Sequence, residues 1–150
     1  MNRSEIGRRN QKLGEQGEAI ARTLLASAGV QDVERSHTGW KLTWEFKGGK
    51  RVVKNAFPLE KVSGDFIGIM NGLKVLVECK ATEEDRVVHS KLEKHQVENL
   101  DRTVAHGGVG FLFVMIKGDP FLLRWPVEGF VAGTSIVLTK GKLVLRGGKQ

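Results

Sequence analysis

The sequence has a single cysteine, Cys79, among 150 residues. One thiol cannot form an internal disulfide bond, and no cysteine or histidine partners stand at the spacing of a zinc site. The sequence also lacks any apolar run close to the roughly 20 residues that cross a bilayer, and residues 1–11 are charged, unlike a signal peptide. We therefore expect a cytoplasmic protein with a reduced thiol, no zinc and no membrane segment.

Acidic residues are the minority, since 17 Asp and Glu stand against 24 Lys and Arg and leave a formal net charge of +7. The excess lies in three segments, residues 1–13, 41–61 and 140–149. Segregated positive charge is typical of a phosphate-binding surface, although a soluble basic protein without that role is the alternative. We predict DNA-binding side chains in the first two segments: Arg3, Arg8, Arg9, Lys12, Lys41, Lys47, Lys50, Arg51 and Lys54.

The apolar pattern predicts a mixed α/β fold in one domain over residues 1–150. A helical stripe runs over residues 11–28, after a flexible basic arm over residues 1–10. Alternating residues predict a hairpin over residues 40–57 and a second hairpin whose strands, residues 66–70 and 73–80, meet at Asn71-Gly72.

The rest of the chain continues this alternation of helix and strand. Ser90 and Glu93 match a capping box, which predicts a helix from there to about His106. A continuous apolar run over residues 109–116 predicts a buried strand, followed by a strand over 121–125 and a hairpin over 136–145. Residues 146–150 are expected to form a flexible tail.

The candidate chemistry lies on the Asn71-Gly72 hairpin. A two-residue turn sets Asp65 opposite Glu78, and the period of two places Lys80 on the same face as Glu78. Facing carboxylates repel each other unless something such as a divalent cation lies between them, and oxygen ligands favour Mg²⁺ or Mn²⁺. The alternative is an ordinary turn aspartate beside an exposed, charged strand end.

Gly64-Asp65, a hairpin and then Val77-Glu78-Cys79-Lys80 resemble the core of PD-(D/E)XK nucleases, with glycine in place of proline. Lys94-His95-Gln96 on a helix, followed by Gly107-Gly108 and an apolar strand, makes the sequence similar to RecU-type Holliday junction resolvases. The resemblance spans residues 14–125. It implies the restriction-endonuclease-like fold, a mixed central sheet flanked by helices, with the hairpin over residues 40–57 as a stalk that enters a four-way junction. The alternative is that Trp40 and Trp44 simply pack into the core.

The resemblance also implies roles for individual residues. A Gly14-x-x-x-Glu18 motif points to Glu18, although a helix-surface glutamate is the alternative. Gln96 would support the site, or else be a satisfied core glutamine. Lys80 would orient the attacking water or stabilise negative charge. The implied catalytic set is Glu18, Asp65, Glu78, Lys80 and Gln96, and the implied Mg²⁺ ligands are Asp65, Glu78, the Cys79 carbonyl and Glu18, with Mn²⁺ as a substitute.

The expected activity is metal-dependent cleavage of four-way junction DNA by paired, symmetric nicks. Two nicks need two active sites, so we expect a homodimer. Two other functions stay open, namely a nuclease of the same core that acts on flaps, other branched DNA or single strands, and a noncatalytic DNA-binding module.

Overall fold

The computed structural model describes residues 3–36, 40–58 and 64–147. Its centre is a mixed five-stranded sheet with the order β1-β4-β5-β7-β8, in which β5 and β7 are parallel and the other neighbours are antiparallel. The predicted fold class is confirmed. The strands are β1 Gln31–Arg35, β4 Phe66–Met70, β5 Leu73–Thr82, β7 Val109–Ile116 and β8 Asp119–Trp125.

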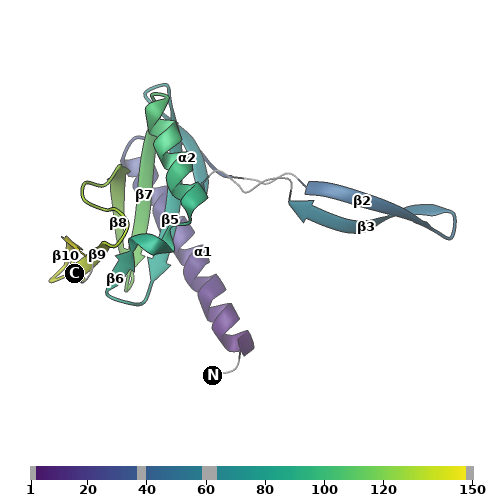
Figure 1. The fold of residues 1–150 in the computed structure, drawn as a ribbon, viewed down its shortest axis with the longest axis horizontal. Helices are drawn as coiled ribbons and strands as arrows, with labels where there is room; N and C mark the ends of the chain where they lie inside the picture. Colours follow the sequence, from purple (N-terminus) through teal and green to yellow (C-terminus); the bar gives the residue numbers. More distant parts are fainter. Residues whose placement is uncertain (1–2, 37–39, 59–63, 148–150) are drawn as a thin grey trace.

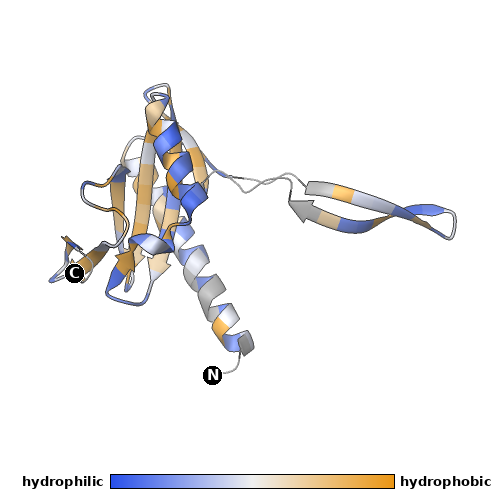
Figure 2. Ribbon diagram, in the orientation of Figure 1, coloured by the Kyte–Doolittle hydropathy of each residue, from blue (hydrophilic) through white to orange (hydrophobic). Residues whose placement is uncertain are grey.

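Two helices cover the two faces of this sheet, α1 Arg3–Ser27 and α2 Lys94–Ala105 (Figure 1). Alternating side chains of β5 pack into the two hydrophobic cores on opposite faces of the sheet. Val75 and Val77 pack on the side of α1, whereas Leu76 packs on the side of α2. Figure 2 shows that the strands of the central sheet carry most of the hydrophobic residues. Every residue of β7 is buried, as its continuous apolar run predicts.

The hairpin formed by β2 Trp40–Lys47 and β3 Lys50–Pro58 stands away from the central sheet (Figure 1). Its position explains why several apolar side chains remain in solvent, with Phe46 78% exposed and Trp44 44% exposed. The alternative in which Trp44 packs into the core is therefore wrong, and the side chain of Trp40 lies outside the described part of the structure.

A smaller three-stranded sheet, in the order β10-β9-β6, packs beside the α2 face. The turn at Lys140-Gly141 joins its last two strands as the sequence predicts. The strands are β6 Arg86–Val88, β9 Ser135–Thr139 and β10 Lys142–Arg146, and a short 3₁₀ helix, η1 His89–Lys91, follows β6. Since β10 reaches Arg146, only part of the expected tail remains, and residues 148–150 lie outside the description.

The helix boundaries correct two predictions. The first helix begins at Arg3, so the described residues of the expected arm continue α1, because good helix formers extend a helix without an apolar stripe. The second helix begins at Lys94, with a capping box made by Glu93 and Gln96 rather than by Ser90 and Glu93. Ser90 lies instead in η1.

Within the described ranges, no helix is long and apolar enough to cross a membrane.

Candidate active site

A bend in the chain brings Asp65 beside β5. The preceding residue, Gly64, has φ +77°, a value that the ring of proline forbids. A Cβ at this position would lie 2.6 Å from Leu76 Cδ1 and 3.0 Å from the Val77 carbonyl oxygen. Asp65 then donates its backbone N–H to that carbonyl at 2.8 Å. Glycine therefore replaces the motif's proline for both conformational and steric reasons.

The pairing of β4 with β5 has the predicted register, from Met70↔Leu73 to Phe66↔Val77. Beyond it, the side chain of Asp65 lies against β5, since its Oδ2 accepts the backbone N–H of Cys79 at 2.7 Å. The Cys79 side chain points away and packs against the α1 core, as the strand period predicts. Burial raises the pKa of this thiol, with the nearby carboxylates adding to the effect, so Cys79 is a neutral packing residue.

Glu78 is the one charged residue among the buried core of the described chain, with a relative exposure of 1%. Burial, the negative charge of Asp65 and a hydrogen bond with its carboxyl together raise the pKa of Glu78 to about 8, while the ammonium of Lys80 acts in the opposite direction. The structure therefore brings the carboxyls of Asp65 and Glu78 and the ammonium of Lys80 together, as predicted. They lie where the buried part of β5 ends, and not on an exposed strand end.

Gln96 connects α2 to the buried carboxylate. Its Nε2 donates to Glu78 Oε2 at 3.0 Å, and its Oε1 accepts the backbone N–H of Glu93 at 2.9 Å. One amide thus closes the first turn of α2 and holds Glu78. The side chain of Gln96 is therefore satisfied by two hydrogen bonds, one of which holds Glu78, and its part in the chemistry stays a prediction.

Glu18 reaches the same region from α1. It lines a pocket of about 140 Å³ together with Asp65, Cys79 and Lys80. Its carboxylate is 3.0 Å from the guanidinium of Arg35, and 33% of its side chain is exposed. Sequence reasoning missed Arg35, because β1 lacks an apolar alternation and was not predicted.

The donor set suits a hard divalent cation. Asp65 and Glu78 bring two carboxylates into contact in a buried setting, and a cation between them would relieve the repulsion that raises the pKa of Glu78. Over the residues that the structure describes, however, no three or more His, Cys, Asp and Glu side chains gather into a metal-binding cluster. The side chains therefore supply a pair of ligands, and backbone oxygen, substrate or water would complete the coordination.

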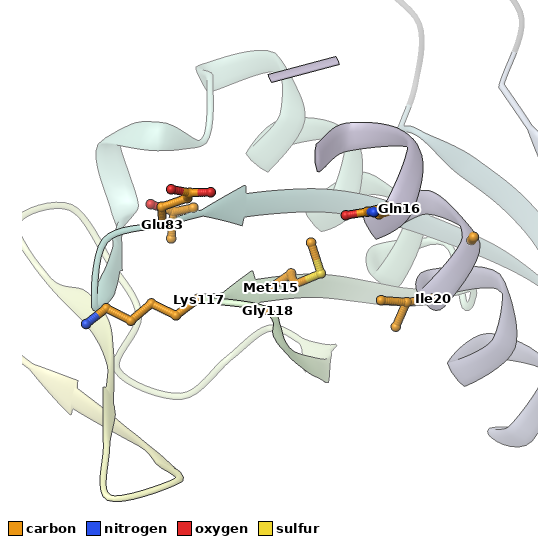
Figure 3. Close-up of a pocket in the computed structure, with 8 residues that line it drawn as sticks. Gln16, Ile20, Glu83, Met115, Lys117 and Gly118 are labelled. Carbon is orange, nitrogen blue, oxygen red and sulfur yellow. The ribbon is translucent and has the colours of Figure 1, made fainter. Parts of the chain in front are cut away.

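A larger cavity, of about 770 Å³, lies beside α1 (Figure 3). Ile20 and Met115 contribute apolar side chains, and its charged lining residues are Glu83 and Lys117. It shares no lining residue with the pocket that contains Glu18. We assign the chemistry to the smaller pocket, because Glu18, Asp65 and Lys80 line it and the carboxyl of Asp65 also meets that of Glu78.

The basic side chains predicted to bind DNA lie on two separate elements. The described ones of α1 are exposed in its amino-terminal half, and the described ones of the hairpin are exposed at its turn and along β3. Arg51 stacks over the ring of Trp44 at 4.5 Å, and Lys47 pairs with Glu45 at 3.3 Å. The exposed members are Arg8, Lys12, Lys47, Lys50, Arg51 and Lys54, whereas the side chains of Arg3, Arg9 and Lys41 lie outside the description.

Comparison with known proteins identifies the family of the chain. Residues 25–126 match the model of the RecU family, described as Recombination protein U. No curated protein matches the sequence. Among solved structures, Hjc, a Holliday junction resolvase from Archaeoglobus fulgidus, is 14% identical with a TM-score of 0.46, over 76% of this chain and 82% of Hjc. The protein SSO0001 is 16% identical with a TM-score of 0.40, over 83% of this chain and 57% of its own. Because the family match covers more than half of the sequence, the chain belongs to the RecU family of Holliday junction resolvases.

Proposed function

We propose that Asp65, Glu78 and Lys80 form the centre at which this resolvase hydrolyses phosphodiester bonds of four-way DNA junctions, with Mg²⁺ as its cofactor. One observation carries the proposal. The carboxyls of Asp65 and Glu78 meet in a buried setting that raises the pKa of Glu78 to about 8, and Lys80 lies beside them. Such an arrangement costs stability, and it is typical of a functional site rather than of a structural ion pair.

The proposed Mg²⁺ ligands are Asp65, Glu78 and the Cys79 carbonyl, with Glu18 completing the shell through water, and Mn²⁺ is a chemically similar substitute. A bound divalent cation supplies Lewis acidity at the scissile phosphate. Two hydrogen bonds prepare the ligands, since the Cys79 N–H holds Asp65 and the Gln96 amide holds Glu78. Fixing both carboxylates in advance lowers the entropy lost when the cation and the phosphate bind.

Lys80 is the cationic group of the proposed centre. It lines the pocket that Asp65 and Glu18 also line, so its ammonium lies where a phosphate oxygen would enter. There it would stabilise negative charge that develops on the phosphate, or orient the attacking water. Arg35 would act through Glu18, because their ion pair fixes the direction of that carboxylate.

The β2-β3 hairpin is the proposed determinant of substrate shape. It projects from the domain, exposes the aromatic side chains of Trp44 and Phe46, and carries Lys50 and Arg51 at its turn (Figure 1). Phosphate contacts alone do not distinguish one DNA structure from another, so a projection that fits an open junction centre would supply the selectivity. Residues 1–150 would then act as one nuclease domain with residues 40–57 as its stalk, in the cytoplasm.

Paired nicks need two active sites, so we further propose a homodimer. Light scattering should give about twice the chain mass of 16.6 kDa at the concentrations used for cleavage. A strict monomer that still makes symmetric nicks would contradict the dimer but leave the catalytic centre standing.

The test of substrate class is a cleavage assay in Mg²⁺ with a mobile four-way junction, linear duplex, flap and single-stranded DNA. The wild type should cut the junction in preference to the other three. Replacing residues 46–51 with a tight turn should preserve basal cleavage and remove that preference, because Asp65 and Glu78 are held by a different hairpin. Circular dichroism and a melting curve of the shortened protein serve as the folding control, and unchanged preference in a folded variant would disprove the stalk.

A further inference from the structure

The third basic segment of the sequence has no part in the proposed active site or stalk. It forms the turn and last strand of the three-stranded sheet, and the sequence contains no Asp or Glu after Glu128. The RecU family match ends at residue 126, before β9 and β10 begin. This hairpin is therefore an element whose role the family match does not assign.

The pairing register sorts the side chains of this sheet onto two faces. Val137 of β9 lies opposite both Arg86 of β6 and Val144 of β10, so these three side chains share one face. The period of two then adds Lys142 and Arg146 to that face. Leu143 and Leu145 fall on the other face, where Leu143 packs against the core.

The face that carries Arg86, Lys142 and Arg146, hereafter the basic sheet face, is exposed along its edge strand β10, whereas Val137 on the central strand β9 is only 3% exposed. Lys142 and Arg146 are exposed, and Val144 between them is 43% exposed. Arg86 pairs with Asp85 at 3.1 Å, which neutralises part of its charge. Among the described residues, neither Lys142 nor Arg146 takes part in an ion pair, so both retain their full charge for an external partner.

The sheet is also joined directly to the catalytic strand. β6 follows β5 after residues 83–85, and η1 leads from β6 to the Gln96 end of α2 (Figure 1). Backbone hydrogen bonds fix this connection, since Leu138 donates to the carbonyl of Asp85 at 2.8 Å and His89 donates to that of Thr134 at 2.9 Å. The three-stranded sheet is thus connected through β6 to the end of β5 that follows Lys80.

We propose that the basic sheet face binds the phosphate backbone of a junction arm that leaves the active site. The inference rests on the proposed function, because that function supplies a duplex arm beside β5. Two exposed cations on one strand, Lys142 and Arg146, without an ion-pair partner among the described residues, suit sequence-independent phosphate contact. Lys142 and Arg146 lie four residues apart on one strand, about 13 Å, which is enough to contact different phosphates of one backbone.

The test compares salt dependence of binding for two matched double variants, without divalent metal so that no DNA is cut. Lys142→Gln with Arg146→Gln removes two charges from the basic sheet face. Lys74→Gln with Arg102→Gln removes two exposed charges beside Gly108, at the opposite ends of β5 and β7, and is the control. Both are measured on junctions whose arms are lengthened in steps and on linear duplexes of matched length.

With long arms, the first double variant should flatten the slope of log K against log salt by about 1.8, or about 0.9 for each lost contact. With the shortest arms, the slope of this variant should equal that of the wild type. The slope of the control variant should equal that of the wild type at every arm length. Val144→Lys, which adds a cation to the same face, should steepen the slope by about 0.9 on long arms only. Melting curves establish that each variant is folded.

An unchanged slope in the first double variant would overturn the proposal, as would an equal loss in both double variants, which is a general effect of net charge. A changed oligomeric state with unchanged DNA binding would also overturn it and assign the face to a second copy of the chain. Failure of the proposed function is distinguishable. In that case the wild type binds DNA without cutting junctions, and the duplex series still decides what the basic sheet face does.

Discussion

Replacing Glu78 with glutamine should stabilise the protein while it abolishes cleavage. The folded structure raises the pKa of this carboxyl from 4.5 to about 8, mainly through burial and then through the charge of Asp65. Between these values the folded protein retains a proton that the unfolded chain has lost. Unfolding therefore releases a proton, and the free energy of unfolding falls as the pH rises from about 4.5 to about 8.

The free energy of unfolding falls by about 1.4 kcal/mol for each pH unit between the two pKa values of Glu78. At pH 7 the burial of an ionisable Glu78 should cost about 2 kcal/mol, after a reduction for screening by nearby solvent. Glu78→Gln cannot ionise, and its amide can still pair with Gln96. The free energy of unfolding of the variant should exceed that of the wild type by about 2 kcal/mol at pH 7, and the two should be equal near pH 4.5.

Urea unfolding followed by circular dichroism, at several pH values and in EDTA, measures this difference. Glu128→Gln is the control, because it removes an exposed carboxyl and should leave the pH dependence unchanged. Adding Mg²⁺ should then stabilise the wild type but not Glu78→Gln, since a cation binds the ionised pair. A Glu78→Gln protein that is less stable than the wild type at pH 7 to 8 would refute the account of the buried carboxylate.

Three further variants examine how the site is held. Gly64→Ala should lose about 1–3 kcal/mol of stability and most of its cleavage rate, because the positive φ and the close approach to Leu76 both displace Asp65. Gly72→Ala has a similar φ with open space around it, so it should lose stability but keep cleavage, and equal kinetics in the two would contradict the steric argument. Gln96→Glu keeps the acceptor that caps α2 but, when ionised, cannot donate to Glu78 and repels its carboxylate, so kcat should fall with little change in junction affinity, and unaltered kcat would leave Gln96 a purely structural cap.

Much of the fold could be predicted because its signals are local. Asn71-Gly72 fixes the β4-β5 register, which brings Asp65 beside the Glu78 end of β5, and the all-apolar β7 has to be buried. Local signals failed at the start of α2, because two candidate capping boxes lie close together there, Ser90 with Glu93 and Glu93 with Gln96. Ser90 and Glu93 fit a capping box, yet Leu92 is buried in the α2 core with extended backbone, and the helix begins after it.

Other features depend on contacts between distant residues. β1 forms only because its polar sequence pairs with β4, so the ion pair of Arg35 with Glu18 could not be predicted from spacing. The Gln96 hydrogen bond to Glu78 joins two elements whose relative placement no local pattern specifies. The projection of the hairpin is likewise a tertiary property, because its aromatic residues equally suit a core strand.

The most direct measurement of the central claim is the cleavage of a mobile four-way junction by Asp65→Asn in Mg²⁺, with junction binding measured in parallel. Asparagine keeps an oxygen that can accept the Cys79 N–H, but it removes the negative charge that faces Glu78. The account predicts that cleavage falls to background while junction affinity and the melting temperature are preserved or raised. Cleavage at the wild-type rate by this variant would contradict the assignment of Asp65 and Glu78 as the catalytic pair.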